Sequence, residues 1–302
     1  MTASEAALVG VDWGTTSLRA WTIGAAGQIL EARHRDLGIL RVPNGDFASA
    51  FAKSVGDWHA LGLPVLMSGM IGSRQGWIEA PYVPCPADLA GFGAHLVSPH
   101  SQERVWIVPG LSLKDGSRRD VIRGEETQIA GAMGSGSGIV VLPGTHSKWV
   151  NVEAGRVIDF ATFMTGELFD VLRRHSILGR LMTDGSPNDD GFRLGVLAVR
   201  DGAGGLSGAL FSVRALGLFG DVAPEALSDY LSGLLIGHEL REALQRFPAP
   251  KALVVGSASL TRRYCLALDL FDVRAEPHDE NAAVKGLFQI ARHAGLMKDT
   301  SP

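Results

Sequence analysis

Two similar loops, one in each half of the chain, constrain the fold more than any other feature. The first lies in residues 11–17, VDWGTTS, and the second in residues 141–147, VLPGTHS. Each loop joins two apolar strands, and a third strand follows a glycine, Gly27 or Gly155. Small hydroxyl residues between strands present N–H and O–H donors, which suit phosphate oxygens. The pattern favours two duplicated domains that bind a polyphosphate from opposite sides over two hairpins that merely share common turn residues.

Length and composition fit a two-domain globular protein. The 302 residues suit two domains of about 150 residues each. We expect the domains at residues 1–134 and 135–302, because a glycine- and serine-rich joint occupies residues 134–138. A hydrophobic content of 46% and a charged content of 20% are ordinary. The formal net charge of −4 shows no excess of positive charge that would attract nucleic acid or an anionic membrane.

Targeting and metal motifs are missing from the sequence. Residues 1–5 lack a basic region, and no apolar run approaches the roughly 18 residues that span a bilayer. We therefore expect a cytoplasmic protein. Cys85 and Cys265 lie far apart in sequence and are most simply free buried thiols. The absence of His-Glu-x-x-His and Cys-x-x-Cys argues against a transition metal held by the protein.

The hydrophobic pattern predicts an α/β chain with the same order of elements in each half. In the first half we expect strands at residues 8–11, 18–23, 28–32, 64–67 and 105–108, a helix at 46–61, and a loop that enters a helix within 119–133. In the second half we expect strands at 139–142, 148–152, 157–160, 252–255 and 272–275, and helices at 166–174, 190–200, 206–216, 224–246, 258–268 and 281–293. The loop 68–88 is too long for a compact domain unless it is functional.

The chain resembles the actin, Hsp70 and sugar-kinase superfamily. Proteins of this superfamily contain two copies of one layout, in which a strand meander is followed by alternating helices and strands. The resemblance is carried by Asp12-x-Gly14-Thr15-Thr16-Ser17, by Gly144–Lys148 and by Val254–Ser257. It implies two duplicated ribonuclease H-like (actin-like ATPase) domains with a central nucleotide cleft. A Walker loop is absent, and the glycine run at 134–138 precedes a strand, which excludes the dinucleotide fingerprint.

Over nearly its whole length the chain is more specifically similar to the 2-dehydro-3-deoxygalactonokinase family. The matching segments are long and idiosyncratic: Val11–Trp21, Met67–Trp77, Glu79–Pro86, Arg123–Gln128, Leu142–Trp149 and Thr162–Glu167. This resemblance implies a kinase that uses ATP and Mg²⁺ in galactonate degradation. The reaction would phosphorylate 2-dehydro-3-deoxy-D-galactonate at the 6-hydroxyl and give 2-dehydro-3-deoxy-6-phosphogalactonate.

The superfamily pattern implies that Asp12 holds a nucleotide-bound Mg²⁺, largely through water. A lone carboxylate at a strand end suits such a hydrated ion, although an Asp can also cap its own turn. The residues expected to bind the nucleotide are Gly14, Thr15, Thr16, Gly144, Thr145 and Ser147 at the phosphates, and Gly256 and Ser257 at the adenosine. Lys148 would add charge at the transferring phosphoryl or face solvent, and His146 would contact phosphate or pack in its loop.

A kinase that acts on an alcohol benefits from a carboxylate that accepts the hydroxyl proton. Glu125 and Glu126 lie at a predicted helix start, where the helix dipole favours an ionised carboxylate near neutral pH. We prefer Glu126 as the base, with Glu125 and Asp120 as alternatives, although acidic residues also decorate ordinary helix starts. The Gly-Glu-Glu pattern also resembles the exopolyphosphatase branch of the superfamily. Many sugar kinases of the superfamily use an Asp as the base in place of a Glu.

The loop from residue 68 to residue 82 is the expected sugar-acid pocket. A keto acid offers a carboxylate and several hydroxyls, for which the expected partners are Ser68, Ser73, Arg74, Gln75 and Glu79. Trp77 and Tyr82 would flank the substrate or anchor the loop. Arg19 would neutralise substrate or γ-phosphate, or form a local salt bridge.

Other functions compete with this kinase. They are a kinase for another sugar acid, an exopolyphosphatase-like phosphoanhydride hydrolase, and an actin-like or sensor ATPase. The hydrolase leaves the 74–82 loop without a purpose, and 302 residues leave little room for the added subdomains of filament formers. We expect a small-molecule sugar acid and ATP as partners, with no nucleic acid and no membrane, and leave a homodimer open.

Overall fold

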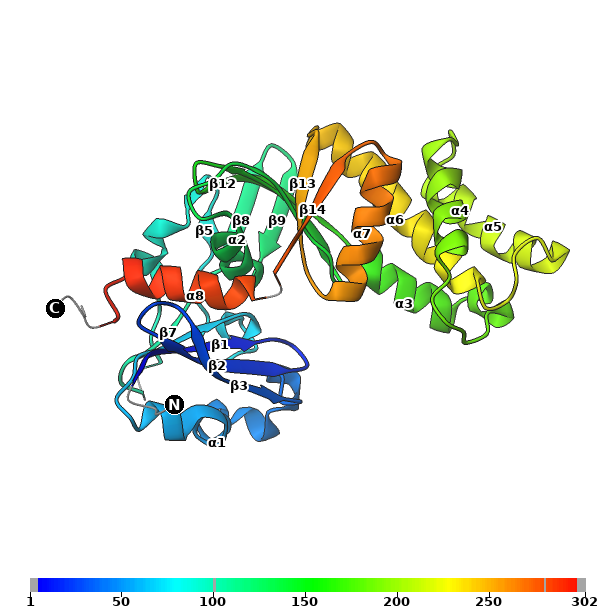
Figure 1. Cartoon of the computed structure of the whole chain (residues 1–302). Coiled ribbons are helices and arrows are strands. Elements are labelled where there is room, and N and C mark those ends of the chain that lie inside the picture. Colours follow the sequence, from blue (N-terminus) through cyan, green and yellow to red (C-terminus); the bar gives the residue numbers. More distant parts are fainter. Residues whose placement is uncertain (1–4, 100–101, 280, 298–302) are drawn as a thin grey trace. The chain divides into compact units, whose positions relative to one another are not determined.

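The computed structural model describes residues 5–99, 102–279 and 281–297 (Figure 1). The chain divides into two compact units. The first takes its residues from Met1–Ser137, Val152–Asp159 and Asn281–Pro302, and the second from Gly138–Asn151 and Phe160–Glu280. The last helix of the chain thus groups with the first unit. The sequence-based domain boundary at residues 134 and 135 concerns the duplicated halves and stays a prediction.

The first unit contains a five-stranded sheet in the order β3-β2-β1-β4-β7. Its strands are β1 (Ala6–Trp13), β2 (Leu18–Gly24), β3 (Ile29–Arg35), β4 (Val65–Ser68) and β7 (Val105–Ile107). β1 pairs antiparallel with β2 and parallel with β4, so the carboxyl ends of β1 and β4 meet at the same edge. The central strands β1 and β4 are apolar along most of their length because both faces of the sheet are covered.

Helices α1 (Phe47–His59) and α8 (Ala282–His293) cover opposite faces of this sheet (Figure 1). Side chains alternate along a strand. Val11 of β1 therefore packs in the apolar cluster that includes the α1 residues, whereas Gly10 faces the other way. A Cβ on Gly10 would lie 3.2 Å from a methyl carbon of Leu287 in α8.

Helix α2 (Glu125–Met133) packs very closely against α8. A Cβ on Gly131 would lie 1.9 Å from the carbonyl oxygen of Ala282, and a Cβ on Gly286 would lie 1.8 Å from that of Thr127. Neither glycine could be replaced without separating the helices. This contact fixes the start of α2, where the predicted catalytic acids lie.

A small three-stranded sheet, in the order β5-β8-β9, also belongs to the first unit. It comprises β5 (Val83–Pro84), β8 (Leu111–Asp115) and β9 (Arg118–Ile122). The sequence analysis missed the antiparallel β8–β9 hairpin and wrongly treated its second strand as a loop. The two-residue turn between the paired Asp115 and Arg118 is Gly116-Ser117, a common hairpin sequence, but the many polar residues of the two short strands obscured the alternation.

The second unit is built on strands in the order β14-β13-β10-β11-β12. They are β10 (Gly138–Leu142), β11 (Ser147–Glu153), β12 (Arg156–Phe163), β13 (Lys251–Val255) and β14 (Arg274–His278). β13 runs parallel to β10 and to β14. The tip of the β11–β12 hairpin groups with the first unit, where Arg156 and Val157 pair with β6 (Ala87–Asp88).

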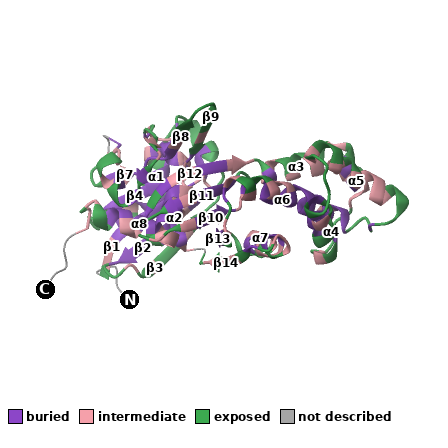
Figure 2. Ribbon diagram, turned by 90° about the horizontal axis from the view of Figure 1, so that it is seen from above, coloured by how far each residue is buried: buried purple, intermediate pink, exposed green. Residues whose placement is uncertain are grey.

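The helices of the second unit differ in burial. They are α3 (Thr165–His175), α4 (Asp189–Arg200), α5 (Leu206–Phe219), α6 (Leu227–Arg246) and α7 (Ala258–Leu270). Most of the first four turns of α6 are buried, whereas Val213 is the one buried residue of α5. Figure 2 colours α5 mainly as intermediate or exposed. Pro224 lies in a turn before α6, so the predicted start of that helix was three residues early.

Short 3-10 helices complete the described chain. They are Ile39–Arg41, Pro43–Gly45, Met70–Gly72, Ala90–His95 and Ile177–Leu181.

In the part of the chain that the structure describes, no helix has the length and apolarity needed to cross a bilayer. Cys85 and Cys265 are free, as predicted, but each is half-buried and not buried. Desolvation raises the pKa of the Cys85 thiol to about 12.

The two main sheets have the same strand order. In the first unit a three-strand meander, β1 to β3, is extended on the β1 side by the parallel strands β4 and β7. In the second unit the meander β10 to β12 is extended on the β10 side by the parallel strands β13 and β14. The predicted α/β fold with duplicated ribonuclease H-like domains is confirmed by this repeat.

Candidate active site

The first phosphate loop connects β1 to β2. The N–H of Gly14 donates to the carbonyl of Ser17 at 2.9 Å and closes the turn. The Gly14 carbonyl in turn accepts the N–H of Ile39 at 3.0 Å. This hydrogen bond holds the loop against the 3-10 helix Ile39–Arg41. The side chains of Thr15 and Thr16 are exposed. Their hydroxyls are therefore accessible to a ligand, as the phosphate-binding prediction requires.

Asp12 lies near the carboxyl end of β1, directly opposite Arg19 of β2. Arg19 Nη2 donates to Asp12 Oδ2 at 2.5 Å. Of the roles expected for Arg19, the local salt bridge is the one that the structure contains. The Asp12 side chain keeps 18% of its surface exposed.

These surroundings fit a hydrated Mg²⁺ at Asp12. A single, partly exposed carboxylate suits an ion whose other ligands are water and phosphate oxygens. Among the described residues, no group of three or more His, Cys, Asp and Glu side chains is placed to hold a metal. An ion at Asp12 would therefore depend on the nucleotide and on water for its remaining ligands.

Two glycines bring the start of α2 against the end of β4, beside Asp12. Gly69 has a φ of 93° and Gly124 a φ of 107°, which other residues rarely adopt. A Cβ on Gly124 would lie 3.3 Å from Gly69 Cα. A Cβ on Gly69 would lie 3.2 Å from Asp12 Oδ1 and 2.8 Å from the Trp13 carbonyl oxygen. Asp12 and the first turn of α2 are thus neighbours within the first unit.

Glu126 is completely buried in that first turn. Its Oε2 accepts the N–H of Gly124 at 2.6 Å, and Oε1 has no hydrogen-bond partner among the described residues. Burial, and to a lesser extent the charge of Glu125, raise the pKa of Glu126 to about 8. The expectation of an ionised carboxylate near neutral pH is therefore wrong for Glu126, because desolvation outweighs the helix dipole.

Backbone N–H groups hold the two alternative bases. Glu125 is half-buried, and its Oε2 accepts the N–H of Arg123 at 3.1 Å. Asp120, on β9, accepts the N–H of Val121 through Oδ1 at 2.8 Å. The choice among the three carboxyl groups stays a prediction.

Arg123 has a role that the sequence analysis missed. Its Nη2 donates to the Ala80 carbonyl at 2.8 Å, and its guanidinium carbon lies 4.2 Å from the centre of the Tyr82 ring. The buried Nε and Nη1 have no hydrogen-bond partner among the described residues. Arg123 thereby ties the predicted sugar-acid loop to the start of α2. Its position immediately before Gly124 and the acidic pair was the available signal.

The predicted sugar-acid loop exposes three of its polar side chains. Arg74 is 86% exposed, and its Nε lies 3.6 Å from Oε2 of the exposed Glu79. Gln75 is exposed as well. These three groups are accessible to a substrate. Because Arg74 is not buried, a neutral sugar would not leave a buried unpaired charge at this position.

The other predicted residues of this loop are more firmly packed. Ser68 and Ser73 are buried, and their hydroxyls have no hydrogen-bond partner among the described residues. Trp77 packs on the apolar cluster around α1, with its ring centre 5.4 Å from that of Phe51. Tyr82 lies under Arg123 but stays 38% exposed. The contacts of Trp77 favour loop anchoring, whereas Tyr82 is also accessible to a substrate.

The second phosphate loop connects β10 to β11 and differs from the first in its charged neighbours. Thr145 is exposed, and His146 Nε2 lies 2.5 Å from Glu167 Oε2. Lys148 is buried, and its Nζ donates to the His146 carbonyl at 2.9 Å. The solvent-facing alternative for Lys148 is therefore wrong.

The start of α3 packs directly on this loop. A Cβ on Gly166 would lie 2.4 Å from the Gly144 carbonyl oxygen and 2.8 Å from Thr145 Cα. The N–H of Glu167 donates to the Thr145 carbonyl at 2.9 Å. The loop is thus fixed by a helix start that follows it by some twenty residues in the sequence.

Glu239, on α6, is a second buried carboxylate that the sequence analysis missed. Its Oε1 accepts hydrogen bonds from Ser147 Oγ at 2.7 Å and from Trp149 Nε1 at 2.8 Å. Its Oε2 accepts from Tyr264 at 2.7 Å and from Thr165. Because the Ser147 hydroxyl is buried and occupied, its contacts favour a loop-fixing role over the predicted phosphate contact.

The predicted adenosine turn lies beside the second loop. Because β10 and β13 are parallel, their carboxyl ends meet. A Cβ on Gly256 would lie 3.5 Å from the carbonyl oxygen of Pro143, which immediately precedes Gly144 in the loop. Ser257 is the exposed N-cap residue of α7.

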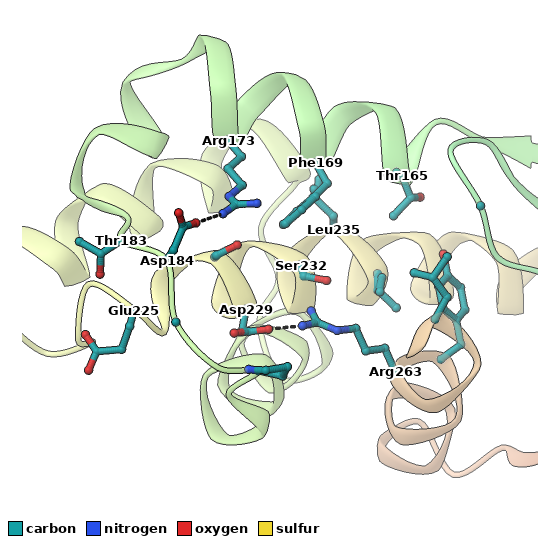
Figure 3. Close-up of a pocket in the computed structure, with 18 residues that line it drawn as sticks. Thr165, Phe169, Arg173, Thr183, Asp184, Glu225, Asp229, Ser232, Leu235 and Arg263 are labelled. Atoms are coloured by element: carbon teal, nitrogen blue, oxygen red, sulfur yellow. Dashed lines mark hydrogen bonds and ion pairs between the residues drawn. The ribbon is translucent and has the colours of Figure 1, made fainter. Parts of the chain in front are cut away.

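A cavity of about 320 Å³ opens next to this loop, within the second unit (Figure 3). Gly144, Thr165 and Gly166 line one end, and residues of α3, α6 and α7 form the walls; Gly256 and Ser257 are not among the lining residues. Asp229 and Arg263 form an ion pair in one wall, and Arg173 pairs with Asp184 at 2.7 Å in another. The cavity therefore combines charged groups with apolar surface.

Comparison with known proteins identifies relatives that match most of the chain. The family model described as 2-keto-3-deoxy-galactonokinase matches residues 12–290. The 2-dehydro-3-deoxygalactonokinase of Escherichia coli (strain K12) is 37% identical over 258 residues, which cover 85% of this chain and 87% of that protein.

Solved structures agree with the sequence relatives. A crystal structure from Sinorhizobium meliloti, assigned as a 2-dehydro-3-deoxygalactonokinase protein, has a TM-score of 0.85 and 38% identity, and the match covers 94% of this chain and 98% of that one. A protein of Porphyromonas gingivalis assigned as an N-acetylglucosamine kinase, at a TM-score of 0.51, 14% identity, and coverage of 94% and 98%, shares the fold. The resemblance inferred from the sequence motifs is confirmed: the chain belongs to the 2-keto-3-deoxy-galactonokinase family.

Proposed function

We propose that this protein transfers the γ-phosphoryl group of ATP to the 6-hydroxyl of 2-dehydro-3-deoxy-D-galactonate. One observation carries the proposal. In a chain of this family, the close approach of Gly69 and Gly124 sets the Asp12 carboxylate beside the acidic first turn of α2. The Escherichia coli relative bears the name of this activity.

The first unit supplies the groups that act on the transferred phosphoryl. Asp12 would hold Mg²⁺, which neutralises phosphate charge when it is bound. The exposed hydroxyls of Thr15 and Thr16 and the nearby backbone N–H groups would donate to β- and γ-phosphate oxygens. Phosphoryl transfer mainly requires such positioning and charge neutralisation.

Glu126 is the base that we prefer for the sugar hydroxyl. Its Oε1 is buried and has no partner among the described residues, so this oxygen would accept the proton once the substrate hydroxyl reaches it. A pKa of about 8 places the carboxyl near the operating range of a general base, provided that it is ionised when substrate is bound. Glu125, which is half-buried, is the alternative.

The second unit would hold the nucleotide. The Gly144 N–H and the Thr145 hydroxyl would bind phosphate. The cavity beside them has a volume of about 320 Å³, a size typical of small-molecule sites, which run to roughly 300–1,000 Å³. We assign the nucleoside to this cavity, where Asp229, Ser232 and Arg263 offer polar contacts and Phe169 and Leu235 offer apolar ones. The sugar acid would contact Arg74, Gln75 and Glu79 on the exposed loop of the first unit.

ADP formation, measured with and without substrate, tests the proposal. We expect ADP to form rapidly with 2-dehydro-3-deoxygalactonate, and slowly with glucose or with no sugar. Rapid ADP release without any sugar would instead support an ATPase. Release of phosphate from polyphosphate would support the hydrolase, and rapid turnover with a different sugar acid alone would redirect the substrate assignment.

A further inference from the structure

Glu239 connects three separate elements around the second phosphate loop. Its carboxylate, on α6, is 3% exposed. It accepts hydrogen bonds from Ser147 and Trp149 of β11, from Thr165 at the start of α3 and from Tyr264 of α7. These donors lie 25 to 92 residues away in the sequence. Each carboxylate oxygen receives two hydrogen bonds, so the arrangement uses the full geometry of an ionised carboxylate.

Two of these donors flank the functional segment. Ser147 ends the second phosphate loop, and Thr165 immediately precedes Gly166, which packs on Gly144 and Thr145. The Glu239 carboxylate therefore fixes both the loop and the helix start that presses on it. Thr165, Gly166 and Tyr264 also line the cavity next to the loop.

The four donors are neutral, and no arginine or lysine is among them. Burial raises the pKa of Glu239, and the hydrogen bonds from Thr165, Ser147, Trp149 and Tyr264 oppose that effect. Keeping a charged group in this place is costly unless its hydrogen bonds are complete. An apolar residue or a glutamine on α6 would fill the space at a lower desolvation cost. Simple core packing therefore does not explain why a carboxylate lies here.

We propose that Glu239 is a positioning residue for the nucleotide: its carboxylate holds the second phosphate loop and the start of α3 in the geometry that binds the ATP phosphates. This inference rests on the proposed function, in which Gly144 and Thr145 bind phosphate. Glu239 itself lies behind the loop, where it acts through Ser147 and Thr165 and does not contact the phosphates.

The test compares Glu239→Gln with a matched core variant, Val196→Ala. Glutamine keeps the shape but turns one acceptor into a donor that faces other donors. Val196, on α4, is buried in the same apolar cluster of the second unit as Trp149 and Tyr264, and it has no hydrogen bond to the loop. The melting temperature of each variant is measured first. Calorimetric binding of Mg-ATP and steady-state kinetics with 2-dehydro-3-deoxygalactonate follow.

We expect Glu239→Gln to weaken Mg-ATP binding and to lower kcat/KM for ATP at least tenfold, with KM for the sugar acid changed less than twofold. Val196→Ala should lower the melting temperature but leave both ATP parameters within twofold. Equal effects of the two variants on ATP, or an equal loss of affinity for both substrates in Glu239→Gln, would overturn the positioning role.

Two further variants keep the inference testable if Glu239→Gln fails to fold. Ser147→Ala and Thr165→Val each remove one donor to the carboxylate and should each raise the dissociation constant of Mg-ATP at least threefold. Unchanged ATP binding in both would refute the inference. Because calorimetry requires no turnover, wild-type protein that binds Mg-ATP but does not phosphorylate the sugar acid would contradict the proposed function alone.

Discussion

At the scale of single residues, Glu126 is the side chain whose environment departs furthest from the sequence-based expectation. A carboxylate in the first turn of a helix is normally ionised at neutral pH. In this fold, complete burial and the neighbouring charge of Glu125 raise its pKa to about 8. Such a carboxyl is a general base only in the fraction of molecules that have lost the proton.

The pH dependence of catalysis follows from this pKa. If Glu126 is the base, kcat/KM for the sugar acid should rise with pH through about 8 in the free enzyme. Glu125→Gln removes a charge that raises the pKa of Glu126, so it should move the rise to lower pH. A pH–rate profile of both proteins measures this. A profile that stays in place in Glu125→Gln would contradict the assignment of Glu126, and near-complete loss of activity would make Glu125 the base.

The same pKa predicts how stability depends on pH. The folded state binds the Glu126 proton more tightly than the unfolded state, whose pKa is near 4.5. Between pH 4.5 and about 8 the free energy of unfolding should therefore fall as pH rises, by up to a few kcal/mol. Glu126→Gln removes this contribution. The melting temperature of the variant minus that of the wild type should therefore increase from pH 5 to pH 8. A constant difference would show that Glu126 is not the source of the pH dependence of stability.

Asp12 gives a sharper test of chemistry. Asp12→Asn should lower kcat on the order of a thousandfold, because it removes the charge that would hold Mg²⁺, while the fold is retained. Asp57→Asn is the matched control, since Asp57 also pairs with an arginine, Arg33, at 2.6 Å in the first unit. The control should keep its activity. Near-normal turnover in Asp12→Asn at saturating Mg²⁺ would remove Asp12 from the mechanism.

At the scale of elements, strong local signals were sufficient for the regular parts of the fold. The spacing of Phe47, Phe51, Val55 and Trp58 predicted α1, and all four side chains are buried. Its N-cap residue, Asp46, accepts the Ser49 N–H at 3.0 Å. The β8–β9 hairpin was missed because its strands are short and largely polar, so tertiary pairing decides their structure.

The contact between Gly69 and Gly124 belongs to this scale, because it fixes the start of α2 at the end of β4. Gly69→Ala should destabilise the protein by about 1–3 kcal/mol and reduce activity strongly, since its Cβ would press on the Trp13 carbonyl and on Asp12. Gly116→Ala is the control, because Gly116 also has a positive φ, of 52°, but open space around it. Denaturant unfolding and kcat measure both. An equal loss of activity in the two variants would mean that backbone strain alone, and not the contact with Asp12, explains the effect.

At the scale of the whole molecule, the duplication was predictable because each half repeats its loop and its strand order. The residues whose contacts join elements distant in the sequence were not predictable in this way. Glu239 lies in the middle of a helix, and its partners are known only once β11, α3 and α7 are assembled. Arg74 is the opposite case, because it was predicted and Glu239 was missed. Its charge suggested a substrate pocket, yet 86% of its side chain is exposed. Local sequence reports which groups are present, and tertiary packing decides which of them are buried.

The identity of the reaction product tests the central claim most directly. With wild-type protein, Mg-ATP and 2-dehydro-3-deoxygalactonate, phosphorus and carbon NMR should show one phosphate ester at carbon 6, formed in equal amount to ADP. Asp12→Asn should form neither product above background. Inorganic phosphate in place of the ester, or an ester at a different carbon, would contradict the account.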